Sequence, residues 1–186
     1  MLQFRGARAL SDFRLAKVLA QLRRVRPGIR SLCAEFRHFV ELEGALDEGE
    51  AKLLERLLRY GAPPAQPGSG DTLYLVVPRI GTISPWSSKA TDIARNCGLS
   101  KVRRIERGTA YFVAGERSAE LAALLHDRMT ESVLDAFDAA GALFQHVPPR
   151  PLGRVALADL EQANRTLGLA LSEDEIAYLR DAYRGL

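Results

Sequence analysis

The feature that most constrains the fold is an internal repeat, in which one half of the sequence lines up with the other at a constant shift of 73 residues. The letters LSDF at positions 10–13 fall on ISPW at 83–86, IR at 29–30 falls on VR at 102–103, and FV at 39–40 falls on FV at 112–113. One register therefore joins a helix start to the end of a strand. Repeats of one supersecondary unit usually pack as a pseudo-twofold pair, so the sequence predicts a tandem α+β domain with two similar βα halves.

Helix caps and apolar alternation predict the elements of each half. In the first half, residues 2–5 form a short strand, Ser11 caps a helix through about residue 25, and residues 29–42 form a long strand. Asp47 and Glu50 form a capping box for a helix to residue 60, and the connector APPAQPGSGD follows. In the second half, strands at 73–78 and 101–114 alternate with helices capped by Ser84 and Ser118, the latter running to about residue 126.

The stretch 78–99, PRIGTISPWSSKATDIARNCGL, contains the strongest helix signals. Ser84 as the N-cap and Pro85 at the first helical position are typical of a helix start, and Gly98 is typical of its end. Between them, apolar residues at spacings of three and four predict one inward face, with Trp86 as the structural anchor together with Ile83. The predicted face consists of Trp86, Ala90, Ile93, Ala94 and Cys97. In the first helix, the corresponding inward residues are Phe13, Leu15, Val18, Leu19 and Leu22.

The chain after the second half predicts a domain boundary. Residues 130–137 fit either a late strand or a helix, and residues 139–145 fit a short helix. Three prolines between positions 148 and 151 then exclude the interior of a helix or a sheet. We therefore expect one domain over residues 1–147, with halves at about 1–61 and 72–137, and the start of a helical linker region over 148–186.

The linker region contains two predicted helices. Residues 158–167 form the first, with Leu160 and Ala163 inward, and residues 173–183 form the second after a capping box of Ser172 and Glu175. Ile176 and Leu179 are the expected inward residues of the second helix. These helices are too few to make a core, so we expect weak docking, poor order or weak self-association of the isolated chain.

Composition narrows the function classes. The 186 residues are 47% hydrophobic and 26% charged, which is typical of a globular protein. The apolar runs are only strand-length and no signal peptide is evident, so we expect no membrane contact and a cytoplasmic location. The net charge of +3 is spread over arginines interleaved with Asp and Glu, so nucleic acid is not an expected partner.

Motifs for catalysis are not recognisable in the sequence. His38, His126 and His146 lack ligand spacing, Cys33 and Cys97 lie far apart, and neither GxxxxGK[ST] nor GxGxxG occurs. We therefore predict no catalytic, cofactor-binding or metal-binding residue. One candidate contact is the turn containing Arg79, Ser84, Ser87, Ser88 and Lys89, where a helix N-terminus between two cations can hold an anion. The alternative is that these polar residues line a domain interface.

Several long segments resemble the N-terminal region of large-type phosphoribosylformylglycinamidine synthase. They are ISPWSSKATDIARNCGL, VRRIERGTAYFV and LHDRM, together with LQFRGARALSDFR, AEFRHFVEL, LLERLLRYG and LGLALSEDEIAYLRDAY. The resemblance implies a piece of a ligase of purine biosynthesis, a glutamine amidotransferase that uses ATP and Mg in its full-length form. The domain then resembles a fused dimer of the split enzyme's small subunit.

The resemblance also implies the partners, which are the synthetase and glutaminase domains of the same full-length chain. The implied role is structural: the domain packs on the synthetase and supports ammonia transfer, and the chain alone is inactive. Two other hypotheses stay open. One is a free-standing protein-interaction module of ferredoxin-like pairs, and the other is a small nucleotide-binding regulator with its ligand at the Ser84 helix start.

Overall fold

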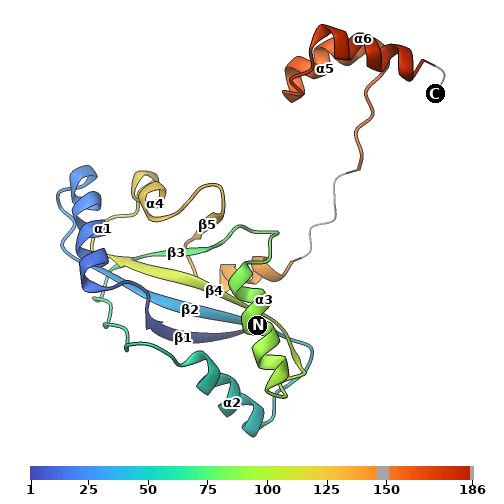
Figure 1. Ribbon diagram of the computed structural model, residues 1–186. Coiled ribbons are helices and arrows are strands. Elements are labelled where there is room, and N and C mark those ends of the chain that lie inside the picture. The colour runs from blue at the N-terminus through green and yellow to red at the C-terminus, as the bar shows by residue number, and fades with distance from the viewer. Residues whose placement is uncertain (146–150, 185–186) are drawn as a thin grey trace. The chain divides into compact units, whose positions relative to one another are not determined.

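The computed structural model describes residues 1–145 and 151–184, and the chain divides into two compact units, Met1–Val147 and Pro148–Leu186. The boundary predicted at 146–151 lies almost entirely outside the described residues. In the first unit, strands and helices alternate before a final 3-10 helix, η1 (Figure 1). The elements are β1 (Leu2–Arg8), α1 (Asp12–Val25), β2 (Leu32–Leu42), α2 (Glu48–Leu58), β3 (Thr72–Pro78), α3 (Pro85–Asn96), β4 (Val102–Val113), α4 (Ala119–Leu125), β5 (Glu131–Leu134) and η1 (Asp138–Phe144).

The five strands form one antiparallel sheet in the order β1-β2-β4-β3-β5. The α+β prediction is confirmed, and the segment 130–137 contains a strand, β5. In both halves the first strand lies outside the second strand and antiparallel to it, and the two second strands, β2 and β4, pair at the centre. Phe36 pairs there with Thr109, which is the residue 73 positions later. The register of the central pair therefore agrees with the shift found in the sequence.

Helix caps fixed from the sequence are present. The side chains of Ser11, Asp47, Ser84 and Ser118 each accept a hydrogen bond from the backbone N–H three residues later. The strand predicted from residue 29 begins only at Leu32, because β4 ends at its partner Val113 and leaves residues 29–31 without an opposing strand. Ile29 is nevertheless buried in the core.

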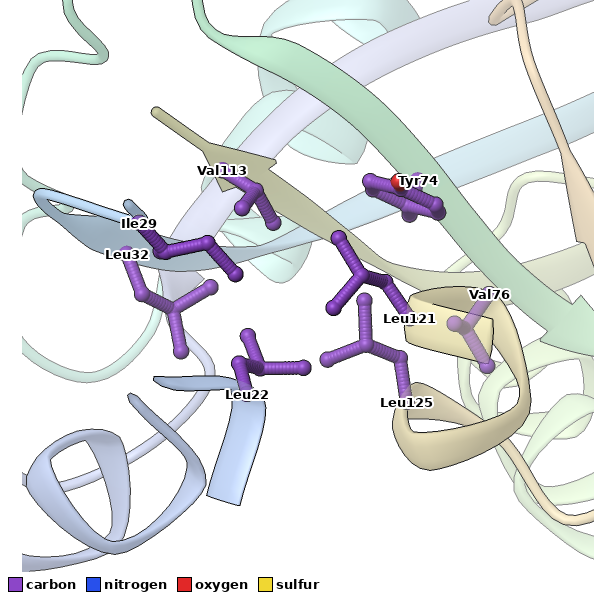
Figure 2. Packing of buried hydrophobic residues seen from close by; sticks show 8 residues of the cluster. All are labelled: Leu22, Ile29, Leu32, Tyr74, Val76, Val113, Leu121 and Leu125. Carbon is purple, nitrogen blue, oxygen red and sulfur yellow. The ribbon is translucent and has the colours of Figure 1, made fainter. Parts of the chain in front are cut away.

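One face of the sheet is covered by two helix pairs, each with its own core cluster. The first cluster joins α1 and α4 to the sheet (Figure 2) and consists of Leu22, Ile29, Leu32, Tyr74, Val76, Val113, Leu121 and Leu125. The second joins α2 and α3 to it and consists of Val40, Leu54, Leu58, Ala94, Leu99, Val102 and Ile105. Each cluster takes residues from both halves of the chain. Neither half therefore completes a core by itself.

The opposite face of the sheet carries a third cluster under η1. Phe39, Leu75, Val77 and Ala110 point to this face because they alternate with residues of the first two clusters, and Ala140 and Leu143 of η1 cover them. The short helix predicted at 139–145 is this 3-10 helix, which starts at Asp138.

Four predicted inward residues are exposed. Phe13 is 78% exposed, Ile83 64% and Ile93 55%, and Cys97 is also exposed. Ile83 therefore does not anchor α3 in the core, and Trp86 is partly buried, packed against the second cluster.

The face of α3 that meets the sheet consists of Ser87, Thr91 and Ala94. These small side chains let the helix approach β4 closely, and Thr91 Oγ1 accepts a hydrogen bond from the Ile105 backbone N–H at 3.0 Å. The apolar periodicity of this helix was misleading because hydroxyl-bearing residues occupy its contact face.

The second unit contains the 3-10 helix η2 (Leu157–Asp159) and the helices α5 (Leu160–Leu167) and α6 (Glu173–Ala182). The capping box of Ser172 and Glu175 is present, and Ala163 and Ile176 are buried. Leu160 and Leu179 are half-buried. Among the residues described, no helix has the length and apolarity needed to cross a membrane.

The shared clusters predict a single unfolding transition for the first unit. Leu22 and Leu54 are fully buried in different clusters, so Leu22→Ala and Leu54→Ala should each lower the free energy of unfolding by about 2–5 kcal/mol. Fluorescence of Trp86, the only tryptophan, reports on the second cluster, yet both variants should shift its urea midpoint. Leu124→Ala, at a 44% exposed position, serves as the control. A Trp86 transition that Leu22→Ala leaves in place would contradict the shared core.

Candidate functional site

The N-terminus of α3 is closed by a carboxylate of the chain itself. Glu106 of β4 is completely buried, and its Oε2 accepts a hydrogen bond from Ser84 Oγ at 2.8 Å. The Ser84 backbone N–H donates to Oε1 of the same carboxylate at 3.3 Å. Ser84 Oγ in turn accepts from the Ser87 N–H at 3.0 Å. Glu106 therefore lies where the sequence suggested an external anion.

Arg104 neutralises Glu106 and ties three segments together. Its guanidinium forms an ion pair with the Glu106 carboxylate, with Nε donating to Oε1 at 3.1 Å. Nη1 donates to the carbonyl of Leu143 in η1 at 2.9 Å, and Nη2 donates to the carbonyl of Thr82 at 2.6 Å. A buried carboxylate needs such pairing to stay ionised. The pair therefore holds η1 and the start of α3 against the sheet.

The structure does not bring the five predicted contact residues together. Arg79 donates to the carbonyl of Met129 at 3.4 Å, on the side of β5. Ser87 and Ser88 line a cavity of about 650 Å³ beside η1, and Ser87 Oγ is buried without a hydrogen-bond partner among the described residues. Lys89 lines a different cavity, of about 230 Å³, between α2 and α3.

A cluster of aromatic and cationic side chains lies on the helix-covered face, near the centre of the sheet. We call Phe36, His38, Tyr60, Trp86 and Arg107 the central cluster. His38 and Arg107 are opposite each other in the β2–β4 register. The Arg107 guanidinium lies 4.1 Å from the Phe36 ring centroid and 4.6 Å from that of Trp86, so it is stacked on two aromatic rings.

Tyr60 and His38 complete the central cluster through hydrogen bonds. Arg107 Nη1 donates to the Tyr60 hydroxyl at 3.1 Å, and His38 Nε2 lies 2.8 Å from the same hydroxyl. The ring centroids of His38 and Trp86 are 5.6 Å apart. Sequence reasoning did not single out these contacts, because they join three elements whose register only the folded sheet fixes.

Burial of His38 and the nearby charge of Arg107 lower its pKa to about 4 from an ordinary value of 6.5. Both effects disfavour the imidazolium, so the ring is neutral at pH 7. Within the part of the chain that the structure describes, no group of three His, Cys, Asp or Glu residues could hold a metal ion. The cluster as a whole offers a fixed cation and aromatic surface, which suit binding.

The lowered pKa predicts acid sensitivity. The unfolded chain takes up a proton on His38 below pH 6.5, whereas the folded chain resists it until about pH 4, so stability is lost as pH falls through this window. The loss should be about 3 kcal/mol between pH 7.5 and pH 4. His38→Gln, which cannot titrate, should remove this part of the pH dependence. Urea unfolding at several pH values measures it, and parallel curves for the two proteins would refute the assignment.

The buried pair predicts a large cost of removing one charge. Glu106→Gln should lower the free energy of unfolding by about 3–5 kcal/mol, because the Arg104 guanidinium is left without its counter-ion. A combined Arg104→Met, Glu106→Met variant should be more stable than Glu106→Gln. Chemical denaturation of the three proteins tests this, and a Glu106→Gln variant within 1 kcal/mol of the parent would exclude the buried-pair account.

Comparison with protein families identifies the chain. The family described as formylglycinamide ribonucleotide amidotransferase N-terminal matches residues 35–144, which is more than half of the sequence. The match begins in β2 and ends with η1, so it spans the central strand pair, α2, α3, α4 and the buried Arg104–Glu106 pair. This chain belongs to the formylglycinamide ribonucleotide amidotransferase N-terminal family, a domain of an enzyme of purine biosynthesis.

Proposed function

We propose that the chain is the assembly domain of the amidotransferase, which converts formylglycinamide ribonucleotide to formylglycinamidine ribonucleotide with glutamine and ATP. In this role it packs on the synthetase domain and supports the passage of ammonia from the glutaminase domain. ATP and Mg are expected to bind in the other parts of the enzyme, and we assign no catalytic, cofactor or metal residue to this chain. A cytoplasmic location goes with this function.

The observation that carries the proposal is the surface of the first unit, considered together with its family. Large apolar side chains at separate positions are open to solvent, with Phe13 at 78%, Met129 at 73% and Ile83 at 64% exposed. The polar groups at the start of α3, by contrast, are used internally by Glu106 and Arg104. Exposed apolar residues on a domain of a larger enzyme support packing against other domains.

The symmetry of the sheet supports a related proposal, that the first unit is a fused pair of small-subunit-like halves. Leu32 pairs with Val113 and Val40 pairs with Ile105, and a shift of 73 residues converts one pair into the other. Arginine side chains repeat as well. Arg23 donates to the carbonyls of Ile29 and Arg30, and Arg95 donates to those of Val102 and Arg103.

The nucleotide-regulator alternative is less well supported, because the Ser84 helix start is filled by Glu106. The free-standing interaction module differs from our proposal only in its partner. Binding to the other domains of the amidotransferase therefore separates these two functions.

Reconstitution tests the proposed function. The chain and the remainder of the amidotransferase are expressed together as two polypeptides, and glutamine-dependent formation of formylglycinamidine ribonucleotide is measured for each piece and for the mixture. We expect the mixture to be active, the chain alone to be inactive, and the remainder alone to be much weaker than the mixture. Activity of the isolated chain, or no association of the two pieces by sedimentation, would overturn the proposal.

A further inference from the structure

Arg107 differs from the other partly buried arginines of the sheet in its electrostatic partners. Arg5 and Arg37 both pair with the buried carboxylate of Glu35, at 2.8 and 2.7 Å. Arg104 pairs with Glu106. Among the described residues, Arg107 forms no ion pair, and its only hydrogen bond is the one from Nη1 to Tyr60.

The stacked position of Arg107 makes its remaining donors ready for a ligand. Phe36 and Trp86 hold the guanidinium plane, so little side-chain entropy is lost when a further partner binds. A guanidinium presents a rigid fork of N–H donors that matches a carboxylate, and such charge-assisted bonds are about twice as strong as neutral ones. His38 is neutral and adds no competing charge at pH 7. A carboxylate from outside the domain is thus the missing partner.

An apolar cleft adjoins this cation. The cavity of about 230 Å³ between α2 and α3 contains two members of the central cluster, Tyr60 and Trp86, in its wall. Its other lining residues are Leu57, Leu58, Lys89, Ala90, Ile93, Ala94 and Ile105. Lys89 is the only charged residue among them, and no acidic residue lines the cleft. The surface therefore combines room for an apolar side chain with positive charge at its border.

We propose that this surface, formed by Tyr60, Trp86, Lys89, Ile93 and Arg107, docks a segment of the amidotransferase's other domains in which a carboxylate lies beside an aliphatic side chain. The carboxylate pairs with Arg107 and the aliphatic group enters the cleft between α2 and α3. Tryptophan, tyrosine and arginine are the residues that most often dominate binding energy at interfaces. The inference rests on the proposed function, since it names the surface through which the assembly domain binds its partner domains.

The test uses the two-polypeptide amidotransferase and measures the Kd of the labelled chain for the remainder. Arg107→Met keeps packing against the aromatic rings but removes the charge and the donors. Lys89→Glu and Ile93→Asp change exposed positions of the cleft, where the fold tolerates substitution. We expect each of the three variants to raise Kd about tenfold or more, and the parent's Kd to rise more steeply with salt than that of Arg107→Met. Arg24→Met, at an exposed arginine of α1, should leave Kd unchanged.

The outcomes separate this inference from the function on which it rests. If the parent chain does not bind the remainder, the proposed function fails and the inference fails with it. If the parent binds but the three variants bind equally well, only the inference is overturned. If Arg107→Met instead abolishes self-association of the chain, the occupant is a second copy and the inference is wrong. Thermal unfolding of each variant shows whether it is folded, and Lys89→Glu and Ile93→Asp keep the test decisive if Arg107→Met is not.

Discussion

The antiparallel pairing of β2 with β4 is the constraint on which the rest of the first unit depends. It places Phe36 opposite Thr109 and thereby fixes where every helix that follows or precedes these strands can pack. Because each strand carries its own helices to one face, α1 meets α4 and α2 meets α3 across the two halves. A register shift by one residue would turn both apolar sets to the wrong face. The central ladder therefore decides both cores at once.

Ionic groups are used in two different ways on this sheet. Glu35 and Glu106 are buried and each is matched by arginine, so these charges maintain the structure and have no capacity left for a ligand. Arg107 is held by aromatic rings in place of a carboxylate. Stacking supplies orientation without cancelling the charge. The distinction between satisfied and unsatisfied cations is what separates structural residues from binding residues in this domain.

The sequence predicted the order and type of the elements well because their signals are local. Ser84 followed by Pro85, or Asp47 with Glu50, defines a helix start whatever the tertiary context. Helix faces were harder, because a small polar residue such as Thr91 can face the sheet when its hydroxyl finds a backbone partner. The central cluster could not be predicted at all, since His38 and Arg107 become neighbours only through the β2–β4 register.

The two halves are no longer alike at the position that matters most for docking. Trp86 lies 73 residues after Phe13, and Arg107 lies 73 residues after Ala34, so the aromatic–cation pair of one half corresponds to an exposed phenylalanine and an alanine in the other. Two identical subunits would have to present any such surface twice. A single continuous chain is free to keep one copy and discard the other. The domain therefore has polarity: a partner that seeks this surface meets it at one end of the sheet only, which fixes a one-to-one stoichiometry and a single orientation.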